Sequence, residues 1–426
     1  MAKISDPFTF PCGITIKNRI VKAALGELLC HPRKGNPTPA LENLYRYWAE
    51  GGAGMLITGH VVIDRVMKGA TRDPVLDEHS DLESYKGYAR AATLNNTKCI
   101  VQLNHPGRLT PAACSSKPVA PSAVPLSKYR FFFKKPRALT ETEIEEIIQK
   151  FTYAAVKSKE CGFHGVEIHG AHGFLLSQFL NPLVNKRTDK WGGSLQNRSR
   201  IIFQIIKRIR QEVGRDGFIV GLKINSADFQ EGGFSHEECR SLVKLIDEEQ
   251  DLDFVELSGG SVESPQTVEE NVRESTKRRE AFFQEFGEDL KKDLRNVALM
   301  VTGGFRTIGG MNNALKEGLE LIGLGRPLIA EPDIVNKLLD GSRTETLLYK
   351  VPTRPQFNTL WHIHQVGLLA KNGKPSLNKS FPLSSLILMK YDYKASYAWI
   401  YLLAIFILIL AILLYYFYPF IIQLFQ

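Results

Sequence analysis

The segment Gly165-Val-Glu-Ile168, followed at once by His169-Gly-Ala-His172-Gly-Phe174 and running on to Pro182, decides the fold. Its first four residues form a mainly apolar run, as in a buried parallel strand. Two histidines three residues apart therefore stand where a strand ends and a loop begins, the edge at which alternating β/α proteins build active sites. Such a pair can hold a substrate oxygen, a metal ion or an anion, or it can be two loop histidines that hydrogen-bond the backbone.

Short apolar runs of this kind alternate along the chain with longer amphipathic ones, the pattern of βαβ units. Convincing helices lie between them, one opening with the capping box Thr140-x-x-Glu143 and another covering about 198–213 with Gly214 past its end. An open doubly wound sheet is the alternative, but no Gly-x-Gly-x-x-Gly follows the first strand. We predict a (β/α)8 TIM barrel with strands at 20–24, 54–58, 99–103, 165–169, 218–224, 254–258, 298–302 and 321–324.

Length and composition fit a single large domain of this kind. The 426 residues could hold two average domains or one barrel with insertions. The six cysteines are scattered without a close pair, which argues against zinc, an iron–sulfur cluster or a disulfide framework, so we expect no metal. The net charge of +9 comes without a nucleic-acid-binding motif, so no nucleic-acid partner is expected.

The C-terminal end differs from the rest of the chain. No charged residue follows Lys394, and 399–417 is almost wholly apolar or aromatic. A run of about 20 such residues spans a bilayer as a helix, whereas a core helix of the barrel would carry polar positions. Lys390 and Lys394 precede the run, so the positive-inside bias places the catalytic part in the cytoplasm. We therefore predict a barrel domain at 1–370, a linker at 371–394 and a single-pass C-terminal transmembrane anchor at 395–418, with no secretory signal at the start.

Two glycine-containing turns end the seventh and eighth predicted strands: Thr302-Gly-Gly-Phe-Arg306 and Gly323-Leu-Gly-Arg-Pro327. Barrel enzymes often bind a cofactor phosphate between these two loops, where glycines let backbone N–H groups approach the phosphate oxygens. Each turn alone is a weak signal. Lys223, inside the apolar fifth strand, should point inward. An ordinary surface lysine is the alternative, which the apolar residues around it disfavour.

The segment from His169 to Asn197-Arg198 closely resembles the signature of the old yellow enzyme family of FMN-dependent oxidoreductases, and the similarity covers about residues 5–370. The resemblance implies that the positions matching His169 and His172 bind the carbonyl oxygen of the substrate. It also implies that Lys223 lies beside the flavin, where a cation favours the anionic reduced form. The remaining predicted FMN contacts are Ala23, Ala24 and Leu25 on the first strand, His60 in the turn after the second, Gln102 on the third, and Gly303, Gly304, Gly325 and Arg326 around the phosphate.

Phe174 departs from the family pattern, because most ene-reductases of the family carry a tyrosine there that protonates the α-carbon of the substrate. Phenylalanine has no proton to give. Alkene reduction would then need water or another acid, or the acceptor would be a quinone, a nitro group or another species.

The sequence thus predicts an enzyme, an FMN-dependent oxidoreductase that passes hydride from NADH or NADPH through flavin to a small-molecule enone, quinone or similar acceptor. Phe174 keeps open a second hypothesis, a membrane-tethered flavin-binding barrel with little turnover. A two-histidine metal hydrolase is weaker, because no carboxylate at metal-ligand spacing accompanies the pair.

Overall fold

Eight parallel strands close into a barrel in the computed structural model, which describes residues 2–127, 132–259, 284–349, 351 and 358–377. The last barrel strand pairs with the first, Ile322 beside Ile20 and Leu324 beside Lys22. This pairing confirms the barrel and excludes the open sheet. The strands, each parallel to its neighbours, are β3 (Ile20–Lys22), β4 (Met55–Val62), β5 (Lys98–Asn104), β8 (Gly165–Gly170), β9 (Ile219–Asn225), β10 (Phe254–Ser258), β11 (Ala298–Thr302) and β12 (Leu321–Leu324).

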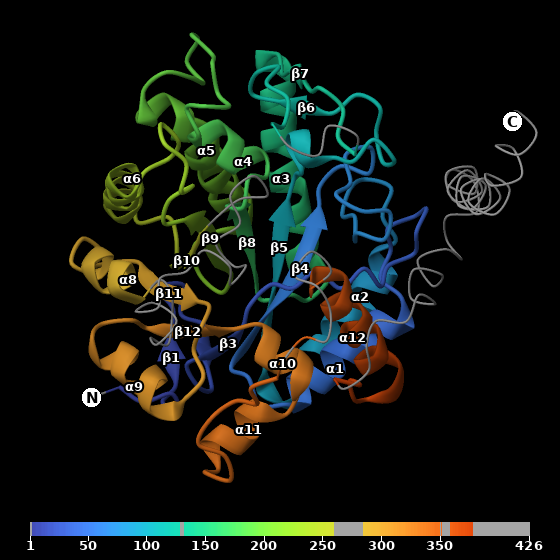
Figure 1. Ribbon diagram of the computed structural model, residues 1–426, viewed down its shortest axis with the longest axis vertical. Helices are drawn as coiled ribbons and strands as arrows, with labels where there is room; N and C mark the ends of the chain where they lie inside the picture. Colours follow the sequence, from blue (N-terminus) through green and yellow to red (C-terminus); the bar gives the residue numbers. More distant parts are fainter. Residues whose placement is uncertain (1, 128–131, 260–283, 350, 352–357, 378–426) are drawn as a thin grey trace, which may run out of the picture. The chain divides into compact units, whose positions relative to one another are not determined.

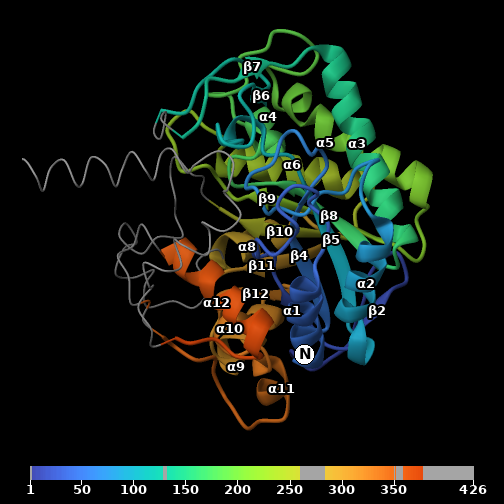
Figure 2. The same ribbon diagram turned by 90° about the vertical axis from the view of Figure 1, so that its right-hand side faces the viewer.

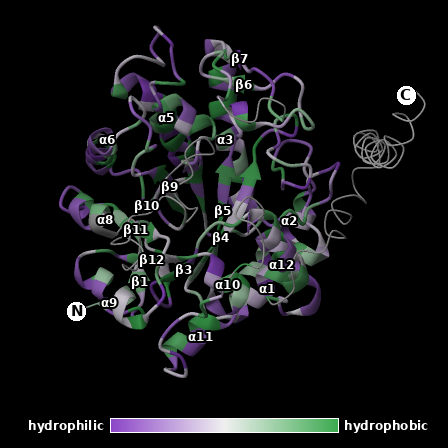
Figure 3. Cartoon of the chain, in the orientation of Figure 1, coloured by the Kyte–Doolittle hydropathy of each residue, from purple (hydrophilic) through white to green (hydrophobic). Residues whose placement is uncertain are grey.

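Helices surround these strands as an outer layer (Figures 1 and 2). In Figure 3 β4 and β5 are mostly hydrophobic, whereas α6 at the periphery is largely hydrophilic, as expected where one side of a helix faces water. The helices are α1 (Pro39–Glu50), α2 (Leu82–Ala92), α3 (Glu141–Glu160), α4 (Leu175–Leu180), α5 (Leu195–Val213), α6 (His236–Glu249), α8 (Gln284–Lys291), α9 (Ile308–Lys316), α10 (Arg326–Ala330), α11 (Ile334–Leu339) and α12 (Asn358–Asn372), with short 3-10 turns η1 (Leu94–Asn96) and η2 (Gly107–Leu109).

Local sequence signals start and stop the long helices. The predicted capping box forms at α3, where the Thr140 side chain accepts from the Glu143 backbone N–H and the Glu143 carboxylate accepts from the Thr140 N–H. Ser194 caps α5 in a similar way. Gly214 ends α5 with φ of 78°, a conformation that glycine adopts without strain.

Two apolar cores hold the barrel together. One fills the space between the strands and the helices, and the other fills the barrel interior. An N-terminal hairpin of β1 (Phe8–Thr9) and β2 (Thr15–Ile16) contributes Phe10 and Ile16 to the interior core. The ring of Phe10 lies 5.9 Å from that of Phe254, the first residue of β10, so the hairpin covers the end of the barrel where the strands begin. The opposite end, where the strands finish, carries the predicted site.

β4 is longer than predicted. It was expected to end at Thr58, with His60 in a turn, but it continues to Val62 after a register shift between Ile57 and His60. Pairing with β5 extends the strand, since His60 lies beside Gln102 and Val62 beside Asn104. The side chain of His60 therefore belongs to the barrel strand itself.

Among the described residues, no helix is both long enough and apolar enough to cross a membrane. The predicted anchor at 395–418 and most of the linker lie outside the described residues. The last described helix, α12, ends at Asn372, close to the predicted end of the barrel domain at 370.

Candidate active site

The register of neighbouring strands brings four polar side chains together inside the barrel. Gln102 on β5 lies beside Glu167 on β8, and its amide Nε2 donates to the Glu167 carboxylate at 2.6 Å. Lys223 on β9 lies beside Glu256 on β10, and its Nζ donates to that carboxylate at 2.6 Å. All four side chains are buried. We call Gln102, Glu167, Lys223 and Glu256 the interior cluster.

Burial alone opposes the charged forms of Lys223 and Glu256, but their mutual attraction outweighs it. The pKa of Lys223 is raised and the pKa of Glu256 is lowered, so the two form an ion pair. Burial raises the pKa of Glu167 well above its usual value, and the neighbouring Glu256 raises it further, so Glu167 stays protonated. Lys223 is thus a cation whose charge Glu256 largely balances. Its electrostatic effect on a bound flavin is therefore weaker than that of the unpaired cation that the sequence predicted.

His169 lies on β8 next to Lys223 in the register, and it is buried. Its Nδ1 accepts the backbone N–H of Ala171 at 3.2 Å, which leaves the proton of the neutral ring on Nε2. Burial, together with His172 and Lys223, lowers the pKa of His169 well below its usual value. The ring is therefore a neutral imidazole with an N–H donor on Nε2.

His172 follows in the loop after β8, with a left-handed backbone at φ of 61°. Its backbone N–H donates to the Asn225 side chain at 3.1 Å, and its Nε2 lies 2.7 Å from the Ser258 hydroxyl. Burial and the charge of Lys223 lower the pKa of His172 to about 3, so this ring is also neutral at neutral pH. The centroids of the His169 and His172 rings are 5.1 Å apart, so the structure brings the two predicted histidines together.

Phe174 stands between the histidine pair and His60. Its ring centroid is 4.9 Å from that of His169 and 5.7 Å from that of His60. His60 in turn lies against a carboxylate, because its Nε2 is 3.2 Å from Oδ1 of Asp73. Four aromatic side chains from β4, β8 and the loop after β8 therefore form one continuous row: His60, Phe174, His169 and His172.

The predicted flavin-contacting residues of the first strand lie at the same end of the barrel. The backbone N–H of Ala23 donates to the carbonyl of Leu324, the last residue of β12. Ala24 and Leu25 follow and are half-buried. A Cβ atom built on Gly325 would lie 3.4 Å from the Leu25 side chain, so this segment adjoins the predicted phosphate loop after β12.

A buried network of hydrogen bonds fixes the residues on either side of that segment. The Glu27 carboxylate accepts from the Tyr45 hydroxyl at 2.5 Å and from the Gly59 N–H at 3.0 Å. Lys22 donates to the Tyr45 hydroxyl at 3.0 Å and to the carbonyl of Ile57 at 2.8 Å. The end of β3 is thereby tied to the middle of β4 and to α1.

The two predicted phosphate loops differ in backbone conformation, since Gly325 has φ of -112°. Gly303 and Gly304 have φ of 119° and 88°, values that other residues rarely adopt, and Gly304 is exposed. Gly325 and the exposed Arg326 follow β12 and begin α10. The Tyr349 hydroxyl, 3.0 Å from Nε2 of His362 on α12, lies close enough for the Arg326 charge to lower its pKa, although burial raises that pKa to about 12.

Sequence reasoning missed three carboxylates: Glu167, Glu256 and Asp73. Two of them had a readable signal, since Glu167 and Glu256 each interrupt an apolar strand of the type Val-Glu-Ile or Val-Glu-Leu. A carboxylate in a fully buried strand must be paired or protonated, which marks it for attention. Asp73 lies in a loop and gave no such signal.

The donor set suits the flavin that the sequence predicts. Lysine carries three N–H donors and the glutamine amide two, and within the described residues Lys223 and Gln102 each give one to a carboxylate. The remaining donors can serve a pyrimidine-like ring edge, Ala23, Ala24 and Leu25 provide an apolar wall, and Gly303 and Gly304 provide a backbone cradle. Among the described residues, no group of three or more histidine, cysteine, aspartate or glutamate side chains is arranged for a metal ion.

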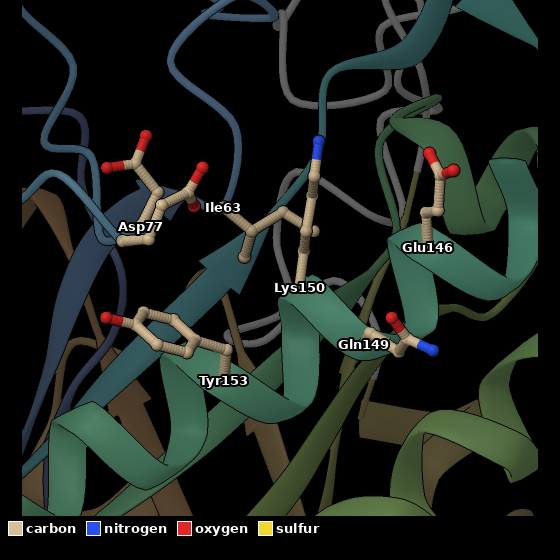
Figure 4. A pocket seen from close by; sticks show the side chains of 7 residues that line it. Ile63, Asp77, Glu146, Gln149, Lys150 and Tyr153 are labelled. Carbon is tan, nitrogen blue, oxygen red and sulfur yellow. The ribbon is translucent and has the colours of Figure 1, made fainter.

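A surface pocket of about 250 Å³ lies apart from this site (Figure 4). It contains none of the predicted site residues. Its lining comes from α3 and from the loop after β4: Ile63, Asp77, Glu78, Glu146, Gln149, Lys150 and Tyr153.

Comparison with known proteins identifies the family. The profile of the NADH:flavin oxidoreductase / NADH oxidase family matches residues 3–345. The NADH-dependent flavin oxidoreductase nadA of Aspergillus parasiticus is 36% identical over 354 residues, 80% of this chain and 78% of the relative.

Solved structures agree on the fold. A 2-naphthoyl-CoA reductase in complex with 2-naphthoyl-CoA aligns with a TM-score of 0.72 at 28% identity, over 80% of this chain and 52% of that one. Morphinone reductase in complex with tetrahydroNAD aligns with a TM-score of 0.67 at 23% identity, over 81% and 92%, which supports the fold alone. This chain belongs to the NADH:flavin oxidoreductase / NADH oxidase family and is an oxidoreductase whose cofactors are FMN and a nicotinamide dinucleotide.

Proposed function

We propose that this enzyme oxidises NADH or NADPH and reduces a small acceptor that carries a conjugated oxygen, such as an enone or a quinone, in the same pocket. The observation that carries the proposal is the pair of neutral imidazoles, His169 and His172, packed together next to Lys223 of the interior cluster. Neutral imidazoles donate hydrogen bonds without giving up a proton, so they polarise an acceptor oxygen as negative charge develops on it. The 2-naphthoyl-CoA held by one structural neighbour also has a carbonyl conjugated to the system being reduced.

FMN supplies the hydride-transfer chemistry when it is bound. Lys223 and Gln102 would hold its pyrimidine edge, and Gly303, Gly304, Gly325 and Arg326 its phosphate. The ion pair with Glu256 fixes the Lys223 ammonium in place. The hydrogen bond from the Gly59 N–H to the Glu27 carboxylate would hold the segment after β3 beside β4 when the cofactor binds.

An anaerobic titration tests the proposal. The purified protein should show flavin absorption bands that bleach on addition of NADH or NADPH and return on addition of 1,4-benzoquinone or 2-cyclohexenone. The alternative function, a flavin-binding barrel with little turnover, predicts bands that neither nicotinamide bleaches.

Replacement of Gly304 by valine should release the flavin. At φ of 88° a β-branched residue is strained, and its methyl groups would occupy the predicted phosphate cradle. Flavins absorb visible light at about 450 nm. We expect the purified variant to lose most of this absorbance per mole of protein. Gly341→Val is the matched control, because Gly341 has φ of 78° but follows α11. Full flavin occupancy in Gly304→Val would contradict the phosphate assignment.

We further propose that residues 395–418 anchor the enzyme in a membrane with its barrel on the cytoplasmic side. The absence of charge after Lys394 and the apolar run at 399–417 support this location. The full-length protein should stay in the membrane pellet through carbonate and high-salt washes. A chain cut after Pro382 should stay in the supernatant and remain yellow, since the barrel has its own core. Release of the full-length protein by carbonate would refute the anchor.

A further inference from the structure

Phe174 cannot supply the proton that alkene reduction requires, yet a titratable side chain lies directly behind it. His60 comes from β4, lies beside Gln102 in the register, and packs its ring 5.7 Å from that of Phe174. Phe174 in turn packs against His169 on its other side. A substrate whose oxygen binds the histidine pair would therefore extend along Phe174 toward His60.

A buried carboxylate faces His60. Asp73 is 1% exposed, and its Oδ2 accepts the backbone N–H of Ala70 at 2.7 Å while Oδ1 faces Nε2 of His60 at 3.2 Å. Gly69 leaves room for the pair, since a Cβ atom there would lie 3.1 Å from Oδ2 of Asp73. The other ring nitrogen of His60, Nδ1, makes no hydrogen bond within the described part of the chain, and the side chain is 21% exposed. Nδ1 is thus available to a ligand or to water.

The pKa values of the three histidines in the row shift in different directions. Burial lowers the pKa of His60, but the carboxylates of Asp73 and then Glu27 outweigh it, and the net pKa is raised. The pKa values of His169 and His172 are both lowered. The charged and titratable groups near His60 are the carboxylates of Asp73 and Glu27 and the two neutral imidazoles. The Lys68 ammonium also interacts with Asp73, and it donates to the carbonyls of Pro32 and Thr71.

We propose that His60 is the general acid that protonates the α-carbon of an α,β-unsaturated carbonyl acceptor, in place of the hydroxyl that Phe174 lacks. This proposal rests on the proposed function and narrows its substrate class to compounds that need a proton on carbon. A quinone can take both protons from water at its oxygens, whereas an enone needs one at carbon inside the pocket.

The β-carbon of the acceptor receives a hydride, with its electron pair, that originates from NADH, and the alkene π electrons move toward the carbonyl oxygen held by His169 and His172. The α-carbon then forms a C–H bond as the Nδ1–H bond of the His60 imidazolium breaks. His60 is left neutral with its remaining proton on Nε2 facing Asp73, and it regains a proton from water. The acceptor gains one hydride and one proton, and NADH becomes NAD⁺.

The primary test compares two acceptors in His60→Gln, because glutamine is polar but not acidic. Full-length enzyme is reduced anaerobically with NADH and mixed in a stopped-flow instrument with 2-cyclohexenone or with 1,4-benzoquinone. We expect the ratio of the cyclohexenone rate to the benzoquinone rate to fall about 100-fold or more, the usual size of general acid catalysis. An unchanged ratio overturns the proposal, and so does an equal loss for both acceptors, because His60 would then only shape the site.

Two further variants separate acid catalysis from structural damage. Phe174→Tyr in the His60→Gln background should restore most of the lost cyclohexenone-to-benzoquinone rate ratio. The new hydroxyl would supply the proton to the same α-carbon. Asp73→Asn should move the falling alkaline limb of the cyclohexenone rate to lower pH, since loss of the carboxylate lowers the His60 pKa. Asp77→Asn is the matched control: its carboxylate lies in the same loop but pairs with Arg65. A limb that stays in place in Asp73→Asn, or that moves equally in Asp77→Asn, overturns the proposal.

A readout without turnover completes the test. The histidine ring signals of the full-length protein are followed by NMR against pH, and the signal missing in His60→Gln is that of His60. Its midpoint should lie above 6.5, the ordinary value for histidine, and should fall in Asp73→Asn. A midpoint below 6.5 overturns the assignment of the acid. If NADH or NADPH fails to reduce the wild-type flavin, the proposed function fails, while a wild-type enzyme that reduces benzoquinone but not cyclohexenone refutes only the role of His60.

Discussion

Replacement of both His169 and His172 by alanine is expected to abolish the long-wavelength band that phenols produce when they stack on bound flavin, and to slow acceptor reduction about 10²–10⁴-fold. Each ring contributes one hydrogen bond to a partly anionic oxygen, and such bonds are worth about 1.5–3 kcal/mol. The two rings pack within 5.1 Å of each other, so one oxygen can engage both. The measurements are a phenol titration followed by absorbance and a single-turnover assay with 1,4-benzoquinone.

His164→Ala is the control for this double variant. His164 stands just before β8 at the opposite end of the same strand, where its Nδ1 accepts the backbone N–H of Cys99 at 3.3 Å. We expect that variant to retain the phenol band. A phenol titration in the double variant that matches the wild type, with flavin still bound, would show that the two histidines do not bind the acceptor oxygen.

Replacement of Lys223 by methionine should destabilise the protein by about 3–5 kcal/mol, the usual cost of leaving one partner of a buried ion pair alone. Glu256 is 0% exposed and would lose the cation 2.6 Å away that keeps it ionised. Its pKa would rise, so the folded state would bind a proton that the unfolded state releases. The loss of stability should therefore grow as the pH rises from 5 to 8, which thermal unfolding at several pH values can measure.

A double variant and a surface control sharpen this prediction. Lys223→Met combined with Glu256→Gln removes both charges, so it should recover much of the stability lost in the single variant. Lys86→Met breaks the exposed pair with Glu83 and should leave the unfolding midpoint almost unchanged, because solvent screens that pair. If Lys223→Met were as stable as the wild type at every pH, the ion pair inside the barrel would not exist in solution.

The sequence by itself determined the eight strands, because each is a local apolar run and the alternation with capped helices follows from local chemistry. The predicted strand at 165–169 became Gly165–Gly170, and the predicted strand at 298–302 was reproduced. Closure into a barrel placed both histidines at the end where parallel strands finish. The sequence did not determine the length of β4. This strand runs past Thr58 and includes His60 only because β5 pairs with it.

The tertiary structure decided which of these residues are charged and which groups they face. Lys223 and Glu256 are 33 positions apart and meet because two strands lie in register, which converts an isolated cation into a balanced pair. His60, Asp73 and Phe174 come from a strand and two different loops, and nothing in their spacing predicts that they touch. A pKa depends on burial and on charges within a few ångströms, and only the folded chain sets those distances.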